Sequence, residues 1–242
     1  MRIVGIIPSR LASTRLPNKP LLDIAGHPMI WHVWNRAKQS ALLSRVCVST
    51  PDAEIAAVIE EAGGSVIITR ADHPTGSDRL AETVHLLGLD DQDIVVNIQG
   101  DEPLIETEAL DAVVRPLLED PLLMMSSACC VCPNESLKNT AAVKVVLDRS
   151  SNALYFSRSL IPYTRNENIV QPKLHIGLYA YKASFLRIFT VLPPSPLEQT
   201  EGLEQLRALE YGYKIRMVEL QHPSVGVDTQ EDLERVRAIL LA

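Results

Sequence analysis

The segment from Arg10 to Lys19 places several groups suited to phosphate binding within ten residues. It contains the cations Arg10, Arg15 and Lys19, with the hydroxyls of Ser13 and Thr14 between them. Arginine presents a planar fork of donors to phosphate oxygens, and lysine presents a compact positive charge. The prolines of the segment restrict its backbone, so less ordering entropy is lost when a ligand binds. These residues indicate a site for a polyanion such as a nucleoside triphosphate, and the alternative interpretation is a solvated basic turn.

Two aspartates could hold a metal ion beside such a polyanion. Asp101 follows the apolar run 94–98 and the turn residue Gly100, and Asp228 follows Val227. Mg²⁺ favours one or two carboxylates together with phosphate oxygens, so Asp101 facing a triphosphate would suit that ion. Either aspartate could instead cap the helix that follows it. For Asp101 the residue pattern leaves both interpretations open, and for Asp228 it favours the cap.

The first half of the chain alternates between two hydrophobic periods, which predicts strands followed by helices. Such alternation is typical of an α/β fold with a mostly parallel central sheet flanked by helices. Ligands of this architecture bind beyond the carboxyl ends of the strands. The basic segment and the turn 99–102 both leave strands there, so we expect them on one rim. The expected strands are 3–7, 46–49, 65–69 and 94–98, and the expected helices are 29–38, 52–62, 77–87 and 106–118.

The pattern becomes strand-rich after residue 121, which predicts a second lobe within a single α/β domain. A last helix should begin after Asp228, where Thr229 and Asp232 form an acidic variant of the capping box. The other elements expected in this part are strands at 124–131, 143–147, 154–156, 176–181 and 213–219, and a helix at 197–210.

Composition excludes several classes of function. The 242 residues carry a formal net charge of −7, which argues against general nucleic-acid binding. No apolar run is long enough to span a bilayer, so we expect no membrane association and a cytoplasmic location. The four cysteines lack a zinc-site pattern and are expected to be buried thiols. There is no glycine-rich dinucleotide fingerprint, no Walker-type loop and no G-x-S-x-G elbow, so phosphate binding must depend on the basic segment.

Eight blocks of sequence, in order and over essentially the whole chain, resemble the family of 3-deoxy-manno-octulosonate (Kdo) cytidylyltransferases. Together they are far more specific than any single block. The blocks are 10–20 (RLASTRLPNKP), 71–82 (ADHPTGSDRLAE), 96–103 (VNIQGDEP), 143–146 (VKVV), 153–158 (ALYFSR), 175–181 (HIGLYAY), 203–207 (LEQLR) and 226–229 (GVDT).

The resemblance implies an enzyme that joins CTP to Kdo, giving CMP-Kdo and pyrophosphate for lipopolysaccharide assembly. It implies a nucleotide-diphospho-sugar transferase-like, Rossmann-like fold, a nucleotide-binding half at 1–120, a sugar-binding and dimerisation half at 121–242, and a homodimer. By this resemblance the CTP phosphates are held by Arg10, Ser13, Arg15 and Lys19, and the nucleotide also by Thr75, Gly76 and Arg79. Mg²⁺ is held by Asp101 and Asp228. The sugar acid is bound by Gln99, Arg158, His175, Tyr179, Glu204 and Gln205.

The expected chemistry is in-line attack of the Kdo C2 hydroxyl on the α-phosphate of CTP, assisted by Mg²⁺, with Arg15, Lys19 and the two aspartates as catalytic groups. Two departures from the family pattern bear on this expectation. Asn18 replaces a glycine before Lys19, and asparagine tolerates the left-handed backbone that the turn needs. Leu174 stands where an arginine commonly precedes His175, which removes one cation near the sugar pocket.

Three other functions stay open at this point. One is a related nucleotidylyltransferase that acts on an amino-substituted Kdo or a sialic-acid-like sugar. Another is a catalytically silent nucleotide-binding or regulatory protein, against which the full set of charged residues argues. A glycosyltransferase would show an Asp-x-Asp motif after a strand, whereas Asp91 and Asp93 precede theirs.

Overall fold

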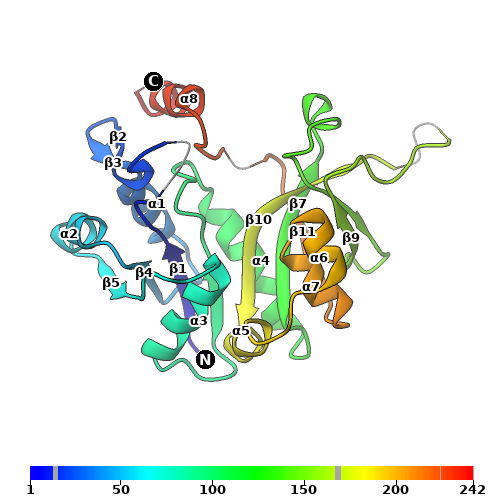
Figure 1. Cartoon of the computed structure of the whole chain (residues 1–242), viewed down its shortest axis with the longest axis horizontal. Helices are drawn as coiled ribbons and strands as arrows, with labels where there is room; N and C mark the ends of the chain where they lie inside the picture. The colour runs from blue at the N-terminus through cyan, green and yellow to red at the C-terminus, as the bar shows by residue number, and fades with distance from the viewer. Residues whose placement is uncertain (13–15, 167–169, 224, 242) are drawn as a thin grey trace. The chain divides into compact units, whose positions relative to one another are not determined.

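The chain folds into two compact units of mixed α/β structure. The computed structural model describes residues 1–12, 16–166, 170–223 and 225–241 and is drawn in Figure 1. The first unit comprises residues 1–111, 182–190 and 224–242, and the second comprises 112–181 and 191–223. The predicted α/β class with a mostly parallel sheet is confirmed. Two short segments from the later part of the chain thus pack with the N-terminal elements.

A parallel sheet forms the centre of the first unit, in the strand order β6-β1-β4-β5. Its strands β6 and β1 are nearly continuous apolar runs, as expected where helices cover both faces of a sheet. The side chains of Ile6 and Ile7 on one strand, and of Val95 and Val96 on its neighbour, are completely buried. The strands are β1 (Ile3–Pro8), β4 (Arg45–Thr50), β5 (Ser65–Ile68) and β6 (Ile94–Asn97).

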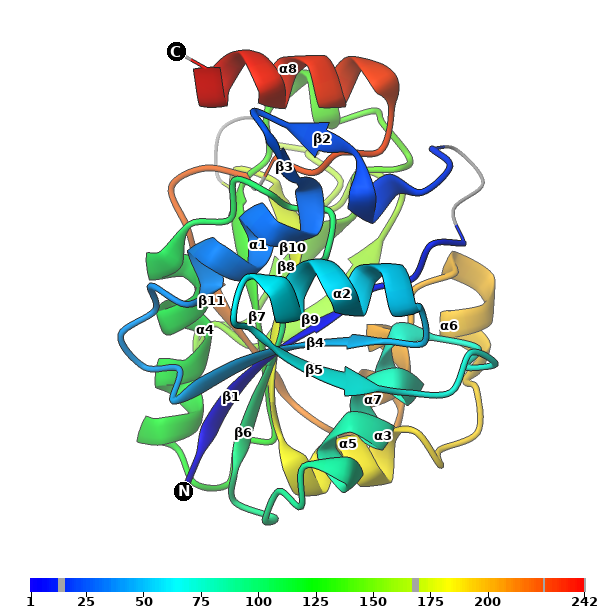
Figure 2. The same ribbon diagram turned by 90° about the vertical axis from the view of Figure 1, so that its left-hand side faces the viewer.

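Helices α1 (Met29–Ala37) and α2 (Ala53–Glu61) lie on one face of this sheet, and α3 (Gly76–Leu86) lies on the other. Figure 2 shows this arrangement, which follows from the right-handedness of βαβ crossovers. The chain runs outward from β1 to β4 and β5, and then returns to place β6 on the other side of β1. The strand order therefore reverses between β1 and β6, where α/β sheets bind their ligands.

A small apolar cluster joins both ends of the chain within the first unit. Ile24 and Met29 from the N-terminal part pack with Val227, Leu233 and Val236 from the C-terminal part. This packing brings the residues before the last helix beside the elements that follow β1. The other elements of this unit are η1 (Lys19–Leu21), β2 (Asp23–Ile24), β3 (His27–Pro28), α5 (Ala183–Phe189) and α8 (Gln230–Leu241), while α4 (Thr107–Glu119) crosses into the second unit.

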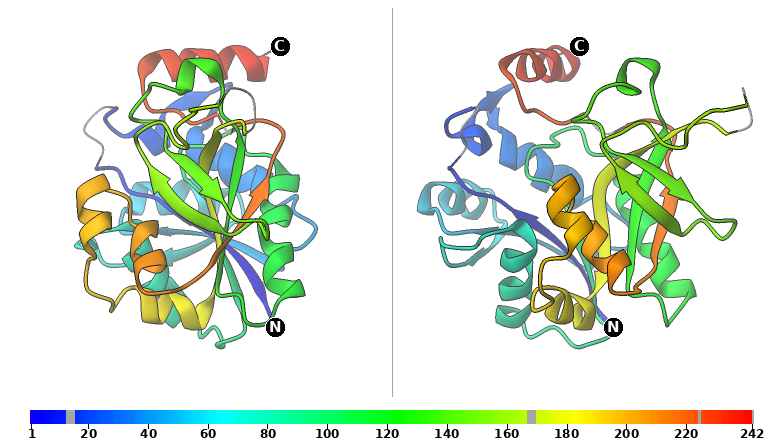
Figure 3. Two further views of the ribbon diagram at one scale, coloured as in Figure 1. Left: turned by 90° about the vertical axis from the view of Figure 1, so that its right-hand side faces the viewer. Right: turned by 45° about the vertical axis from the view of Figure 1, so that its right-hand side comes forward.

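The second unit contains a mixed sheet in which β11 pairs in parallel with β7, and β7, β10, β8 and β9 pair antiparallel in that order. Figure 3 shows these strands from two sides. The pairing of β10 with β7 shifts register between Ile176 and Tyr179, as at a β-bulge. The elements are β7 (Met125–Val131), η2 (Asn134–Ser136), β8 (Lys144–Leu147), β9 (Ala153–Ser157), β10 (Lys173–Lys182), α6 (Pro196–Glu201), α7 (Gln205–Glu210) and β11 (Ile215–Glu219).

Two local features differ from the predictions. The helix predicted at 197–210 is two helices, because Gly202 takes a left-handed conformation with φ of 62° and ends α6. Helix α5 was not predicted. The helix predicted at 106–118 is confirmed as α4, which continues through Pro116 to Glu119 because burial of Val113 and Leu117 on its apolar face outweighs the lost hydrogen bond.

Two further expectations from composition can be compared with the structure. The four cysteines are buried thiols, as predicted, and burial raises the pKa of Cys47 to about 12 and of Cys129 to about 11. Within the described ranges, the helices are all too short or too polar to cross a membrane.

Candidate functional site

The side chains of Lys19, Asp101 and Asp228 meet in one cavity of the first unit. The Nζ atom of Lys19 donates to Asp101 Oδ2 at 2.6 Å and to Asp228 Oδ1 at 2.9 Å. Three residues that lie far apart in sequence therefore converge on one point, as the resemblance implied for two of them. The cavity has a volume of about 330 Å³ and is lined by Pro8, Ser9, Arg10, Ala12, Lys19, Pro20, Met29, Gln99, Gly100, Asp101 and Asp228.

The turn before Lys19 is made by an asparagine in a conformation that usually favours glycine. Asn18 has φ of 53° and ψ of 30°, and its carbonyl accepts from the backbone of Leu21 at 2.8 Å. Asparagine is among the residues that tolerate this region, so the turn is retained without glycine. The short 3₁₀ helix that begins at Lys19 directs the ammonium group into the cavity, which confirms the expectation for Asn18.

Asp101 is positioned by a close approach between two strand ends. A Cβ atom at Gly100 would lie 3.1 Å from the Pro8 carbonyl oxygen, so glycine lets the turn after β6 pack tightly against the end of β1. The carbonyl of Asp101 accepts from the backbone N–H of Val227 at 2.9 Å. This hydrogen bond joins the turn to the segment that carries Asp228.

The N-terminus of α8 is capped by neighbours of Asp228. Thr229 Oγ1 accepts from the backbone N–H of Asp232 at 3.2 Å, and the Asp232 carboxylate accepts from the N–H of Thr229 at 3.0 Å. This is the predicted acidic capping box. The capping interpretation of Asp228 was wrong, because Thr229 and Asp232 form the capping box while the side chain of Asp228 bonds to Lys19.

Lys19 remains charged in this environment. Burial disfavours its ammonium, but the charge of Asp101 and the hydrogen bonds to Asp101 and Asp228 outweigh that effect and raise the pKa of Lys19. The group is therefore a permanent cation between two carboxylates. Across the described residues, no cluster of three or more His, Cys, Asp or Glu side chains could hold a metal ion. Two carboxylates alone still suit Mg²⁺ that takes its other ligands from phosphate and water.

A second cavity of about 180 Å³ lies in the same unit, at the N-terminus of α3. Thr75 caps this helix through a capping box with Asp78, and Gly76 is its first residue. Arg79 is buried, and its Nη1 donates to Thr69 Oγ1 at 2.5 Å and to the Arg70 carbonyl at 2.9 Å. The cavity is lined by Pro8, Ser9, Arg10, His73, Pro74, Thr75, Gly76, Arg79 and Gln99.

Two guanidinium groups lie close enough at the second cavity to repel each other. Burial and the charge of Arg10 lower the pKa of Arg79, although the carboxylates of Asp52 and Glu82 work in the opposite direction. The two cavities share the residues Pro8, Ser9, Arg10 and Gln99 as a common wall. The structure therefore brings Arg10, Gln99, Thr75, Gly76 and Arg79 into one continuous region with Lys19 and the aspartates, whereas Ser13 and Arg15 lie outside the described residues.

Sequence reasoning missed a histidine–glutamate pair beside the second cavity. His73 is buried, and its Nε2 bonds to Glu82 Oε2 at 2.5 Å. Glu82 also accepts from the backbone of Arg70 at 3.0 Å. The pair therefore ties the cavity-lining loop to α3. The spacing of nine residues between His73 and Glu82 in the second motif was the only signal in the sequence.

A second group of predicted residues lies in the second unit. The rings of His175 and Tyr179 are 5.4 Å apart, and the ring of Phe156 lies 4.9 Å from His175. Burial and the nearby charge of Glu204 raise the pKa of Tyr179, so its phenol stays protonated. Gln205 is the first residue of α7, and its side chain is buried. The structure thus brings together His175 and Tyr179, with Glu204 close enough for its charge to act on Tyr179.

The hydrogen bonds around Ser127 determine which nitrogen of His175 carries the proton. Ser127 Oγ lies 2.9 Å from the Leu178 carbonyl, which can only accept, so the hydroxyl donates there. The same oxygen lies 3.0 Å from His175 Nε2 and must accept from it. Burial lowers the pKa of His175 to about 3, so the ring is neutral. His175 therefore carries its proton on Nε2 and keeps Nδ1 as an acceptor.

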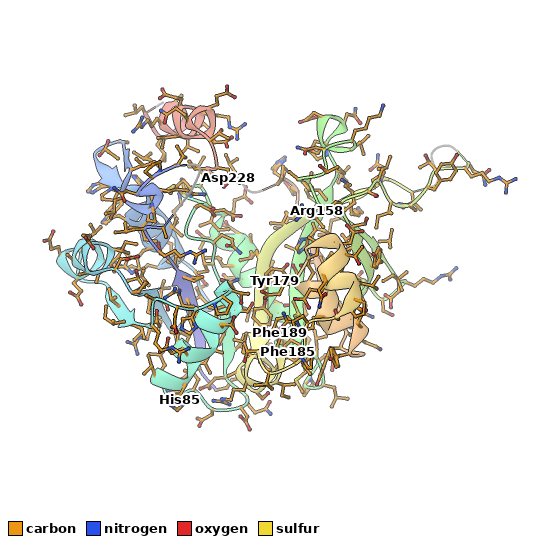
Figure 4. All side chains as sticks on the ribbon, in the orientation of Figure 1. His85, Arg158, Tyr179, Phe185, Phe189 and Asp228 are labelled. Carbon is orange, nitrogen blue, oxygen red and sulfur yellow. The ribbon has the colours of Figure 1, made fainter. Side chains whose placement is uncertain are left out.

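Arg158 is held by backbone carbonyls rather than by a side-chain carboxylate. Its Nε donates to the Glu201 carbonyl at 2.8 Å, Nη1 to the Thr140 carbonyl at 3.1 Å and Nη2 to the Gly202 carbonyl at 3.3 Å. These bonds use three of the five N–H groups of the guanidinium. Figure 4 labels Arg158 and Tyr179 in this unit.

Lys144, for which the sequence predicted no role, supports the backbone around Arg158. It is completely buried and donates to the carbonyls of Asn139, Ala142 and Arg158 at 2.9, 2.5 and 2.7 Å. Beside Leu174, the ammonium of Lys173 pairs with Glu219.

The fold and the first site define a class of protein. A parallel sheet that reverses its order beside a cationic segment, with Asp101 beyond the carboxyl end of β6 and Asp228 brought beside it from the segment before α8, is the arrangement of a nucleotidyltransferase. A family model described as cytidylyltransferase matches residues 4–215.

Comparisons over the full length are more specific. The chain is 50% identical to 3-deoxy-manno-octulosonate cytidylyltransferase from Syntrophus aciditrophicus (strain SB), over 99% of this chain and 98% of that protein. It is 49% identical to the protein of the same description from Yersinia enterocolitica, over 100% and 99%. A solved structure of CMP:2-keto-3-deoxy-manno-octonic acid synthetase complexed with CTP matches with a TM-score of 0.95 and 41% identity, covering 100% and 99% of the two chains. The chain belongs to the family of 3-deoxy-manno-octulosonate cytidylyltransferases.

Proposed function

We propose that this protein transfers a cytidylyl group from CTP to 3-deoxy-D-manno-octulosonate, forming CMP-Kdo and releasing pyrophosphate. The observation that carries the proposal is the convergence of Lys19, Asp101 and Asp228 in a cavity that shares a wall with the nucleotide-motif cavity. Relatives of about 50% identity that cover the whole chain support the choice of substrates. The product serves lipopolysaccharide biosynthesis.

The cations of the first unit neutralise and orient the triphosphate. Arg10 and Arg79 repel each other beside the second cavity, so an anion bound near them is stabilised by both. Lys19 supplies a permanent positive charge next to the two aspartates. Held charges of this kind stabilise the phosphoryl oxygens of the transition state and need no reorganisation during the reaction. Arg15 and Ser13 are proposed to extend this set along the same loop.

Asp101 and Asp228 would hold Mg²⁺, since their carboxylate oxygens already face one cation from two sides. When bound, the ion would lower the pKa of the attacking hydroxyl and stabilise charge on the phosphates. The ammonium of Lys19 bonds one oxygen of each carboxylate and would compete with a metal ion for them. Lys19 is then available to bond a phosphate oxygen.

Residues of the second unit are proposed to bind the sugar acid. Arg158 has two N–H groups beyond those that bond Glu201, Thr140 and Gly202, and these suit a carboxylate. Neutral His175 presents Nδ1 as an acceptor, which suits a sugar hydroxyl. With its pKa near 3, His175 is too weak a base to deprotonate the attacking hydroxyl at neutral pH.

A pyrophosphate-release assay with CTP, Mg²⁺ and Kdo tests the proposal. Turnover with Kdo that exceeds turnover with an amino-substituted Kdo or a sialic acid supports the stated substrate. Turnover with one of those sugars but not with Kdo would assign the chain to the alternative sugar acid. Binding of CTP without turnover of any of them would make the protein a nucleotide-binding regulator.

The homodimer and the location are also proposals. Four exposed apolar side chains of the second unit would be covered by a second copy of the chain, namely Leu154, Leu160, Tyr163 and Val170. Light scattering coupled to gel filtration tests this, and a monomeric mass at micromolar concentration would contradict it. The cytoplasm, where CTP is made, is the proposed compartment.

A further inference from the structure

Ser9 carries a buried hydroxyl group that has no assigned role. The residue is only 7% exposed, and its Oγ finds no hydrogen-bond partner within the described part of the chain. Its backbone N–H is already used, because it donates to the Ser49 carbonyl at 2.9 Å. A buried polar atom without a partner costs free energy, and a ligand that supplies the partner is one explanation for its presence.

The position of Ser9 identifies where such a partner would lie. Ser9 directly follows β1, at the point where the strand order reverses, and it lines both cavities of the first unit. One cavity contains Lys19 with Asp101 and Asp228, and the other contains the N-terminus of α3. A molecule that occupies both cavities must pass the wall to which Ser9 belongs.

The positive charges at this shared wall favour an anionic group in the part of the ligand that lies beside it. Arg10 is the neighbour of Ser9 and lines both cavities, and its charge disfavours the nearby charge of Arg79. An anionic group placed there relieves that repulsion. In a nucleoside triphosphate, the anionic group between the nucleoside and the distal phosphates is the α-phosphate.

We propose that the Ser9 hydroxyl donates a hydrogen bond to the α-phosphate of the bound nucleotide. This assignment rests on the proposed function, because the α-phosphate is the atom group that the sugar hydroxyl attacks. Arg10 supplies charge at this position, and the Ser9 hydroxyl, which has no partner among the described residues, can orient its hydrogen toward the phosphate oxygen. Ser9 is thus a substrate-binding residue at the reacting phosphate.

The test compares Ser9→Ala with Ser195→Ala. Ser195 is also a buried serine, it is the N-cap residue of α6, and it is not among the residues that line either cavity, so it serves as a control for the loss of a buried hydroxyl away from the site. Calorimetric titration of CTP and CMP should show affinities about 10- to 100-fold weaker for Ser9→Ala, the range for a hydrogen bond to a charged group. Cytidine, which has no phosphate, should bind both variants and the wild type equally.

Thermal unfolding separates this role from a structural one. Without nucleotide, Ser9→Ala should unfold at the wild-type temperature or above it, because the substitution removes an unsatisfied buried group. With CTP it should be stabilised less than the wild type. Equal affinity of Ser9→Ala and wild type for CMP, or an equal loss for cytidine, would overturn the assignment. Absence of pyrophosphate release by a wild type that binds CMP would refute the proposed reaction alone.

Discussion

Replacing Lys19 with methionine should tighten the binding of a divalent metal ion in the absence of nucleotide. The ammonium of Lys19 donates to Asp101 at 2.6 Å and to Asp228 at 2.9 Å. A metal ion bound by these carboxylates would compete with the ammonium for their oxygens. The substitution removes this competitor and leaves both carboxylates in place.

The size of the expected change in metal affinity depends on how exposed the two carboxylates are to solvent. Charge-assisted hydrogen bonds between buried groups contribute about 1.5–3 kcal/mol each. The side chains of Asp101 and Asp228 are 38% and 49% exposed, so solvent screening reduces each contribution toward the value of surface pairs, about 1 kcal/mol or less. Displacing Lys19 therefore costs about 1–2 kcal/mol in total, which corresponds to roughly 5- to 30-fold in affinity.

Titration with Mn²⁺, followed by electron paramagnetic resonance, measures this affinity without any turnover. Lys38→Met is the matched control, because it removes the same charge from the same unit, where Lys38 lies 4.1 Å from the ring of Trp34. We expect Lys19→Met to bind Mn²⁺ more tightly than both the wild type and the control, but to bind CTP more weakly. Equal Mn²⁺ affinity in all three proteins would refute the idea that the ammonium competes with the metal.

Three other substitutions test separate parts of the site. Asp101→Ala should abolish pyrophosphate release while circular dichroism and thermal unfolding remain close to wild type, since the side chain lies at the rim; near-normal activity would contradict a metal-binding role. Burial lowers the pKa of His175 from about 6.5 in the unfolded chain to about 3 in the folded protein. As the pH falls below 6.5, the unfolded chain binds a proton that the folded protein does not, so the free energy of unfolding decreases. At pH 5.5 this costs about 1.4 kcal/mol, which urea unfolding should detect in the wild type and not in His175→Gln; parallel pH profiles would refute it. Ser127→Ala removes the acceptor of the proton on His175 Nε2, so the ¹⁵N resonances of this ring should show a changed tautomer balance. The KM for Kdo should then rise more than kcat falls. An unchanged ¹⁵N spectrum would contradict the proposed tautomer of His175.

The positions of the charged site residues of the first unit followed from the sequence because their chemistry and the strand order agree. A parallel sheet brings the ends of β1 and β6 to one rim, and the expected Arg10, Gln99 and Asp101 line one cavity there. Asp228 could not be assigned from its neighbours, because an aspartate before a helix also suits a cap. The contact of its carboxylate with Lys19, which is distant in sequence, is what separates the two interpretations.

Interactions that depend on partners distant in sequence could not be predicted. Helix α5 has only seven residues, too few for its period to stand out, and its burial of Phe185 and Phe189 depends on tertiary packing. The tautomer of His175 depends on Ser127, 48 residues earlier, and on a β-bulge that places the Leu178 carbonyl beside that hydroxyl. No local pattern in the sequence specifies either contact.

The two units handle their polar groups in opposite ways. In the second unit, Lys144 and Arg158 each donate three hydrogen bonds to backbone carbonyls, which fixes the loop around them before any ligand arrives. In the first unit, Lys19 bonds to carboxylates that a metal would claim, and Ser9 Oγ has no bond within the described residues. A pocket that is already formed loses less entropy when a ligand binds. In contrast, a side chain that is unpaired, or paired with a group that the ligand claims, is stabilised only when the ligand supplies its hydrogen bond. The nucleotide end of the reaction is therefore where ligand binding should stabilise the protein most.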